Sequence, residues 1–185
     1  KMQVPGADRQ FTLFFDDVRV GEDRLLGREG QGLPQVFVGL NPERILGAAL
    51  ANGAALHALE QASTYANERA VWGRPIGTHQ GIAHPLAQAK IEVELARLMT
   101  MKAAWLFDRG LDAGEAANMA KYAAGEAATH AVDVAIQVHG GNGMSEEYGL
   151  VSLWAMARTL RIAPVSREMI LNFIAQHTLH LPKSY

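Results

Sequence analysis

The run Gln137-Val-His-Gly-Gly-Asn-Gly143 ends a long alanine-rich stretch and carries three glycines in its last four positions. One glycine at the end of a helix is an ordinary left-handed cap. Three glycines remove side chains from a whole surface element, so a second backbone or a ligand can approach closely there. We interpret this run as a candidate binding element, with a simple helix cap as the alternative.

A second candidate is Asn41-Pro-Glu-Arg44. Asn41 is a suitable N-cap and Pro42 a suitable first helical residue, which predicts Glu43 in the first turn of a helix. The helix dipole favours an ionised carboxylate at that position. Gly47 follows one turn later on the same face and leaves room beside Glu43. The alternative is that Glu43 only complements the dipole and that Arg44 is a solvated or paired charge.

A third candidate is the segment from Asn67 to Gln80, which combines arginine, tryptophan and a loop of Gly and Pro before the next helix. Arginine offers a forked set of donors that suits phosphate, and a helix N-terminus adds backbone donors. Trp72 could contact a planar ring. The alternative is an ordinary helix hairpin in which Trp72 packs on the bundle and Arg69 lies near a helix C-terminus.

Helical periodicity dominates the elements that must position these residues. Aromatic and branched residues at 11–20 predict one or two strands. Asp112, with Glu115 three residues later, resembles a capping box that opens a helix. The pattern predicts a mainly α protein, an antiparallel helical bundle preceded by a short β segment. The expected helices span 34–40, 41–69, 79–107, 112–138, 147–160 and 165–179.

Composition excludes several classes of function. The chain has 185 residues, of which 49% are hydrophobic and 19% charged, with a formal net charge of −2, so neither nucleic acid nor an anionic membrane surface is indicated as a partner. It has no cysteine, which excludes disulfides and thiolate chemistry. Its seven histidines lack the spacing of a metal site, so no metal is expected. The sequence has no signal peptide or apolar run of membrane-spanning length, and we expect a cytoplasmic protein.

The chain starts with Lys1 rather than methionine and runs almost at once into strand-like sequence. We therefore expect it to be the inside of a longer protein, with part of any active site elsewhere.

Taken in order, these segments closely resemble the acyl-CoA dehydrogenase family over essentially the whole chain. Arg69-x-x-Trp-Gly73 is similar to the family's R-x-x-F-G motif, with Trp72 in the place of Phe. The resemblance assigns residues 1–33 to the end of a middle β-domain and its connecting loop, and 34–185 to the C-terminal helical bundle domain. The other matching segments are Phe14-Phe-Asp-Asp-Val-Arg-Val20, His79-Gln80, Glu92-x-Glu-Leu-Ala-Arg97 and Gln137 to Gly143, although Gly21 stands where a proline is usual.

The resemblance implies a flavoprotein that removes two hydrogens across the α–β bond of an acyl-CoA thioester. Many members carry the catalytic base as a glutamate before the last helix, but Pro164 occupies that place here. A second branch carries its glutamate in a Leu-x-x-Glu-Arg context, which Leu40-Asn-Pro-Glu-Arg44 fits. The resemblance therefore predicts Glu43 as the base.

The same resemblance implies the remaining site residues and partners. Asn41 and Arg44 are predicted to contact acyl-CoA, and an electron-transfer flavoprotein is the expected electron acceptor. Relatives take FAD contacts from a neighbouring subunit, which predicts a homo-oligomer (a dimer or dimer of dimers) or a hetero-oligomer. The predicted FAD-binding residues are Arg69, Trp72, Gln80, Gln137, Val138, His139, Gly140, Gly141 and Ser166.

Two other functions stay open at this point. Because Pro164 replaces the commoner glutamate, the chain could be a non-catalytic partner subunit of an acyl-CoA dehydrogenase-like complex. It could also be a helical interaction module without a cofactor. We expect the chain to be inactive alone. Histidines 57, 84, 130 and 177 are interpreted as packed or solvated groups, and the backbone of His139 is expected to matter more than its ring. Met99, Met101 and Trp105 are predicted to lie in the core by their spacing.

Overall fold

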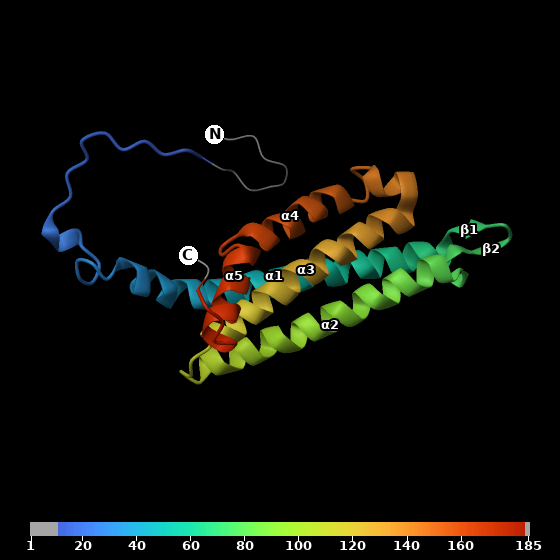
Figure 1. The fold of residues 1–185 in the computed structure, drawn as a ribbon. Coiled ribbons are helices and arrows are strands. Elements are labelled where there is room, and N and C mark those ends of the chain that lie inside the picture. The colour runs from blue at the N-terminus through green and yellow to red at the C-terminus, as the bar shows by residue number, and fades with distance from the viewer. Residues whose placement is uncertain (1–10, 184–185) are drawn as a thin grey trace.

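The structure, a computed structural model, describes residues 11–183, and helices dominate it (Figure 1). The mainly α bundle expected from the sequence is confirmed. No helix within the described range is long and apolar enough to cross a membrane. The helices are α1 (Gly32–Glu68), α2 (Gln80–Asp108), α3 (Gly114–His139), α4 (Leu150–Ile162) and α5 (Arg167–Phe173).

Helix α3 occupies the centre of the bundle and packs against α1, α2 and α4 (Figure 1). Small side chains on α3 let the neighbouring axes approach closely, because little bulk separates the backbones. At Gly125 an added Cβ would lie 3.3 Å from the Cα of Arg161 on α4. The buried alanines of α3 are Ala116, Ala117, Ala120, Ala124, Ala127, Ala128, Ala131 and Ala135.

Helix α1 is one continuous helix of 37 residues, so the predicted break after residue 40 and the N-cap at Asn41 are wrong. Pro42 lies inside the helix, where it removes one backbone hydrogen bond. The guanidinium of Arg44 bridges this turn, since its Nε donates to the Leu40 carbonyl and its Nη2 to the Asn41 side chain. These two side-chain hydrogen bonds hold the turn that contains Pro42.

The strands expected at 11–20 are absent, because this stretch forms no strand and is exposed along its length. A strand needs a partner for its backbone groups, and the described chain offers none here. In Figure 1 the segment before α1 loops away from the bundle. The one sheet in residues 11–183 is instead a hairpin between α1 and α2, in which β1 (Ala70–Val71) pairs antiparallel with β2 (Arg74–Pro75).

The other helix boundaries differ from prediction by a few residues. The capping box is wrong, because Asp112 accepts from the Gly114 amide at 2.9 Å whereas Glu115 accepts from Thr178. Helix α4 begins at Leu150, three residues later than the pattern indicated. After α5 the chain continues as a π-helical turn, Ile174–Thr178.

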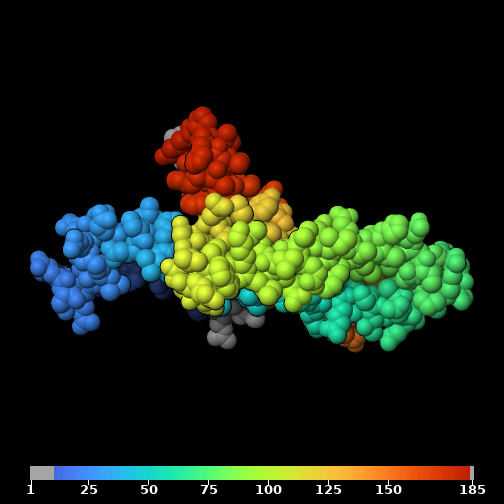
Figure 2. Space-filling model, turned by 90° about the horizontal axis from the view of Figure 1, so that it is seen from below, coloured from blue at the N-terminus to red at the C-terminus, as the bar shows by residue number. Residues whose placement is uncertain are grey.

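The outer face of α2 is more apolar than a bundle surface requires, and Figure 2 shows this helix along much of the length of one side of the molecule. Met101 and Trp105 are 65% and 53% exposed, so their assignment to the core is wrong, while Met99 is partly buried. Smaller residues take the positions that face the bundle: Ala89, Val93, Ala96, Thr100 and Ala103. The exposed apolar residues along α2 are Ile91, Leu95, Leu98, Met101, Trp105 and Phe107.

The close packing of α3 predicts a steric penalty for larger side chains on it. Ala128 is fully buried, so Ala128→Leu should lower the free energy of unfolding of this chain by about 1–3 kcal/mol through overpacking. Urea unfolding followed by circular dichroism measures the change. The matched control is Ala49→Leu at an exposed position of α1, which should stay within about 0.5 kcal/mol. Equal effects of the two variants would contradict the packing argument.

Candidate functional site

A different structural feature explains glycine at each of the three positions after α3. We call Gly140 to Gly143 the glycine corner. Gly140 has φ 59° and ψ −134°, a conformation that residues with a Cβ rarely adopt. An added Cβ at Gly143 would lie 2.5 Å from the Ile136 carbonyl oxygen, so the backbone itself fills that space. Nothing lies within 4 Å of an added Cβ at Gly141, which is exposed. Packing therefore explains Gly143, backbone conformation explains Gly140, and Gly141 leaves an open surface.

The ring of His139 anchors the glycine corner, a structural role that the sequence analysis did not assign to it. The ring is buried, and its Nδ1 lies 2.7 Å from the Ala135 carbonyl, to which it donates. It stacks on Tyr65 of α1 at 4.3 Å between centroids and meets Tyr148 edge-on at 5.0 Å. Asn142 donates to the Tyr65 hydroxyl at 3.1 Å. These contacts fix the glycine corner to the C-terminal end of α1.

The hairpin after α1 presents Trp72 to solvent at the same end of the bundle (Figure 1). Trp72 and Gly73 have φ of 53° and 78°, as a tight two-residue hairpin loop requires. Trp72 is 88% exposed and touches His79 edge-on, so the alternative in which it packs on the bundle is wrong. A bulky residue at positive φ is strained, typically by about 1–3 kcal/mol. Arg69 and Gln80, at the two ends of this connection, are also exposed.

A second group of predicted residues lies on the N-terminal half of α1. Glu43 is exposed and sits about three turns inside the helix, so the predicted support from the helix dipole is wrong. Arg44 is only 3% exposed, and burial lowers its pKa. Its Nη1 donates to Asn118 Oδ1 of α3 at 2.6 Å. The guanidinium is thus held by protein acceptors, and its predicted contact with CoA stays a prediction.

The α4–α5 loop meets α1 at Gly47. An added Cβ at Gly47 would lie 3.9 Å from Cδ of Pro164 and 3.9 Å from a methyl group of Leu160. Glu43 precedes Gly47 by one turn on the same face of α1. Glu43 therefore lies one turn from the point at which Pro164 meets the helix, and it is exposed.

Lys121 holds this loop, and sequence reasoning missed it. It is 2% exposed, and its Nζ donates to the carbonyls of Val165 at 2.5 Å and Arg161 at 3.2 Å. Burial, opposed by the carboxylates of Glu168 and Glu126, lowers its pKa to about 8. A signal was present in the sequence, because Asn118 and Lys121 interrupt an alanine face at a spacing of three residues.

Ser166 caps α5 and borders a small polar cavity. Its Oγ accepts from the Met169 amide at 3.3 Å, which leaves the hydroxyl hydrogen free to donate elsewhere. The cavity beside it measures about 350 Å³. Sequence reasoning did not single out its three arginines, Arg158, Arg161 and Arg167.

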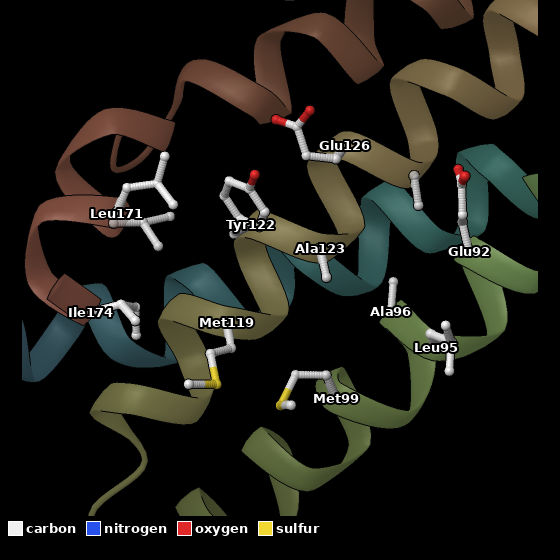
Figure 3. Close-up of a pocket in the computed structure, with 12 residues that line it drawn as sticks. Glu92, Leu95, Ala96, Met99, Met119, Tyr122, Ala123, Glu126, Leu171 and Ile174 are labelled. Carbon is white, nitrogen blue, oxygen red and sulfur yellow. The ribbon is translucent and has the colours of Figure 1, made fainter. Parts of the chain in front are cut away.

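The largest of the grooves we describe is apolar and lies elsewhere. It measures about 610 Å³ and lies between α2, α3 and α5 (Figure 3). Met99, Met119 and Ile174 line it, with the carboxylates of Glu92 and Glu126 also at its edge. None of the predicted site residues borders it, so it supplies none of the chemistry that the sequence indicated.

The predicted site residues thus fall into two groups that one chain does not bring together. Arg69, Trp72, Gln80 and the glycine corner share one end of the bundle. Ser166 ends the α4–α5 loop, and Glu43 lies one turn from Gly47, which that loop contacts. Arg44 and Arg69 are separated by 25 residues of α1 and its cap, which is about 37 Å along a helix axis. A single copy of the chain therefore does not unite the two groups.

Comparisons with known proteins show the family of the chain. Residues 30–179 match the family model of the acyl-CoA dehydrogenase C-terminal domain. The acyl-CoA dehydrogenase FadE12 of Mycobacterium tuberculosis is 57% identical over 187 residues, covering 100% of this chain and 48% of that protein. The chain belongs to the acyl-CoA dehydrogenase family. It spans about half the length of the curated relatives it matches.

Two solved structures share the fold of this chain. A glutaryl-CoA dehydrogenase in complex with glutaryl-CoA is 37% identical with a TM-score of 0.85, over 92% of this chain and 44% of that one. PigA with FAD and proline is 29% identical with a TM-score of 0.86, over 90% of this chain and 43% of that one.

The glycine corner generates a paired stability prediction. Gly143→Ala should lower the free energy of unfolding by about 1–3 kcal/mol, because its new methyl group must displace the backbone at Ile136. Gly141→Ala in the same element should change it by less than about 0.5 kcal/mol, since the added methyl group meets open space. Chemical denaturation of both variants is the measurement, and a larger loss at Gly141 would contradict the assignment.

Proposed function

We propose that the protein containing this chain is an FAD-dependent acyl-CoA dehydrogenase that removes hydrogens across the α–β bond of an acyl-CoA thioester. One observation supports the proposal within the family: Pro164 lies against Gly47 of α1, one turn from Glu43. In this chain the loop position that resembles the commoner base site holds no carboxylate. In the proposal, Glu43 supplies one from the neighbouring turn of α1.

In this proposal Glu43 takes the α-proton. A base in this role must be ionised, within reach of the carbon acid and shielded from bulk water. Glu43 is exposed in the single chain, so a neighbouring domain or subunit must cover it. Asn41 keeps its amide nitrogen available for the substrate because its oxygen is engaged by Arg44. Arg44 contacts CoA only if its guanidinium leaves Asn118.

The exposed end of the bundle is suited to the phosphates and adenosine of FAD. Gly141 offers bare backbone, and Arg69, Trp72, Gln80 and Gln137 are exposed beside or near it. Val138 and His139 have buried side chains, so they would take part through their backbone. Ser166 belongs to the other group of site residues, near the α4–α5 loop. Its hydroxyl hydrogen is free beside three arginines, and in the proposal it contacts the flavin. When bound, FAD supplies the acceptor for the hydride from the β-carbon.

We further propose that two copies complete each site. The two groups of site residues lie about 37 Å apart along α1, so one copy does not place both groups around the same ligand. The exposed apolar face of α2 is the kind of surface that a subunit or domain covers. A homo-oligomer is the simplest arrangement, and a hetero-oligomer is the alternative. The proposed electron acceptor is an electron-transfer flavoprotein. Residues 1–33 would end a preceding β-domain, of which 1–10 lie outside the described residues.

If Glu43 is the catalytic base, its substitution should slow the reduction of the flavin. Glu43→Gln in the whole protein should slow flavin reduction by acyl-CoA by at least about 10²- to 10⁴-fold, because the amide cannot accept the proton. Anaerobic stopped-flow absorbance of the bound flavin measures the rate. Asp133→Asn, at an exposed carboxylate of α3, is the control and should react like the wild type. An unchanged rate in Glu43→Gln would assign the base elsewhere.

A second function is favoured by Pro164 alone. If the chain belongs to a non-catalytic partner subunit, wild-type protein should bind FAD yet fail to reduce it with any acyl-CoA. The same stopped-flow experiment separates this function from the first.

The 185 residues alone should bind FAD weakly or not at all and should show no dehydrogenase activity. Glu43 lacks a cover in one chain, and the two groups of site residues lie apart. Equilibrium dialysis with FAD and an acyl-CoA reduction assay measure both properties. Stoichiometric FAD together with turnover would refute this expectation.

A further inference from the structure

The first half of helix α3 carries two buried polar side chains on an otherwise small and apolar face. Asn118 and Lys121 are each 2% exposed and lie one turn apart. Burial of an ammonium group is unfavourable unless acceptors replace its water. Lys121 finds these acceptors in two backbone carbonyls, those of Arg161 and Val165. The two carbonyls lie on either side of Pro164, which meets α1 at Gly47.

Each of the two polar residues attaches one element near Glu43 to α3. Asn118 accepts from Arg44, which follows Glu43 on α1. Lys121 donates to the loop that carries Pro164. One turn later Gly125 brings the α3 backbone close to Arg161 in the last turn of α4, so the start of the loop is held by a steric contact as well. Helix α3 therefore holds both the turn of α1 that contains Arg44 and the loop that meets α1 at Gly47.

We propose that Lys121 is a positioning residue that holds residues 162–166 over Gly47 and so sets the width of the substrate space beside Glu43. The inference rests on the proposed function, because the position of this loop matters for catalysis only if Glu43 acts as the base. Lysine suits this task because one ammonium group has three donors on a long stem, and here it spans from α3 to two carbonyls four residues apart. Lys121 acts through the loop and touches no substrate.

The test uses the whole protein with Lys121→Met, which keeps an unbranched apolar stem and removes the donors. Two readouts are measured: amide hydrogen exchange at residues 162–166, and flavin reduction at varied acyl-CoA expressed per bound flavin. Exchange there should become at least about 10-fold faster, as a loop released from its anchor opens more often. The rate constant per flavin should fall by about 10- to 100-fold at saturating substrate, with a higher KM, since small misplacements have such effects.

Two controls separate positioning from general stability. Thr100→Val removes the hydrogen bond between Asn52 and Thr100, a buried link between α1 and α2 away from the loop. Thr100→Val should lower the melting temperature. It should change neither the amide exchange at residues 162–166 nor the rate of flavin reduction per bound flavin. Lys102→Met, at an exposed lysine of α2, controls for the loss of a positive charge. If Lys121→Met does not fold, Lys121→Gln keeps a shorter donor and should show the same changes to a smaller degree.

Faster loop exchange together with a lower rate per flavin supports the inference. Unchanged amide exchange at residues 162–166 overturns the inference. A rate constant per flavin and a KM that both equal those of the wild type also overturn it, because Lys121 would then have a purely structural role. If no acyl-CoA reduces the flavin of the wild-type protein, the proposed function is overturned, and so is the catalytic role of the loop. The exchange data would then still show whether Lys121 fixes the loop.

Discussion

The close approach of α3 to its neighbours is the constraint on which the rest of the structure depends. Alanines and Gly125 bring the backbones of α1, α2 and α4 near the α3 axis. Such packing leaves little space for water, so any polar group on α3 must find its partner in the protein. Asn118 and Lys121 satisfy this requirement by binding Arg44 and the α4–α5 loop. The packing of the central helix thereby also determines where the candidate base lies.

Helix α1 connects two chemically different regions. Near its middle lies the turn that contains Glu43, and at its end lie Tyr65 and the hairpin with Trp72. The stacking of Tyr65 on His139 ties that end to the glycine corner, and the contact of Gly47 with Pro164 ties the first half to the α4–α5 loop. Each region is well anchored by itself. Their separation along one stiff helix is what favours an assembly of more than one chain.

Several features were predictable from the sequence because they depend on local chemistry. The glycine corner, the hairpin at Trp72 and the long helices all follow from capping, turn and periodicity rules. The prediction failed where tertiary contacts override these rules. Arg44 stabilises the turn around Pro42, which hides the apparent helix start. Trp105 is exposed because alanines fill the inner face of α2, and a strand at 11–20 lacks a partner within the described residues. Lys121 was missed because its acceptors are backbone groups some forty residues away, which no local pattern reveals.

The contact between Gly47 and Pro164 has an evolutionary consequence. The resemblance to the family implies two alternative places for a catalytic glutamate, and in this chain they lie on neighbouring elements, because Pro164 contacts the position of Gly47, one turn along α1 from Glu43. A lineage could acquire an acid on the helix while the one on the loop was still present, and later lose the older acid. Such a transfer would pass through an ancestor with both carboxylates and would require no change in the course of the backbone. Pro164 would then be a mark of the completed exchange.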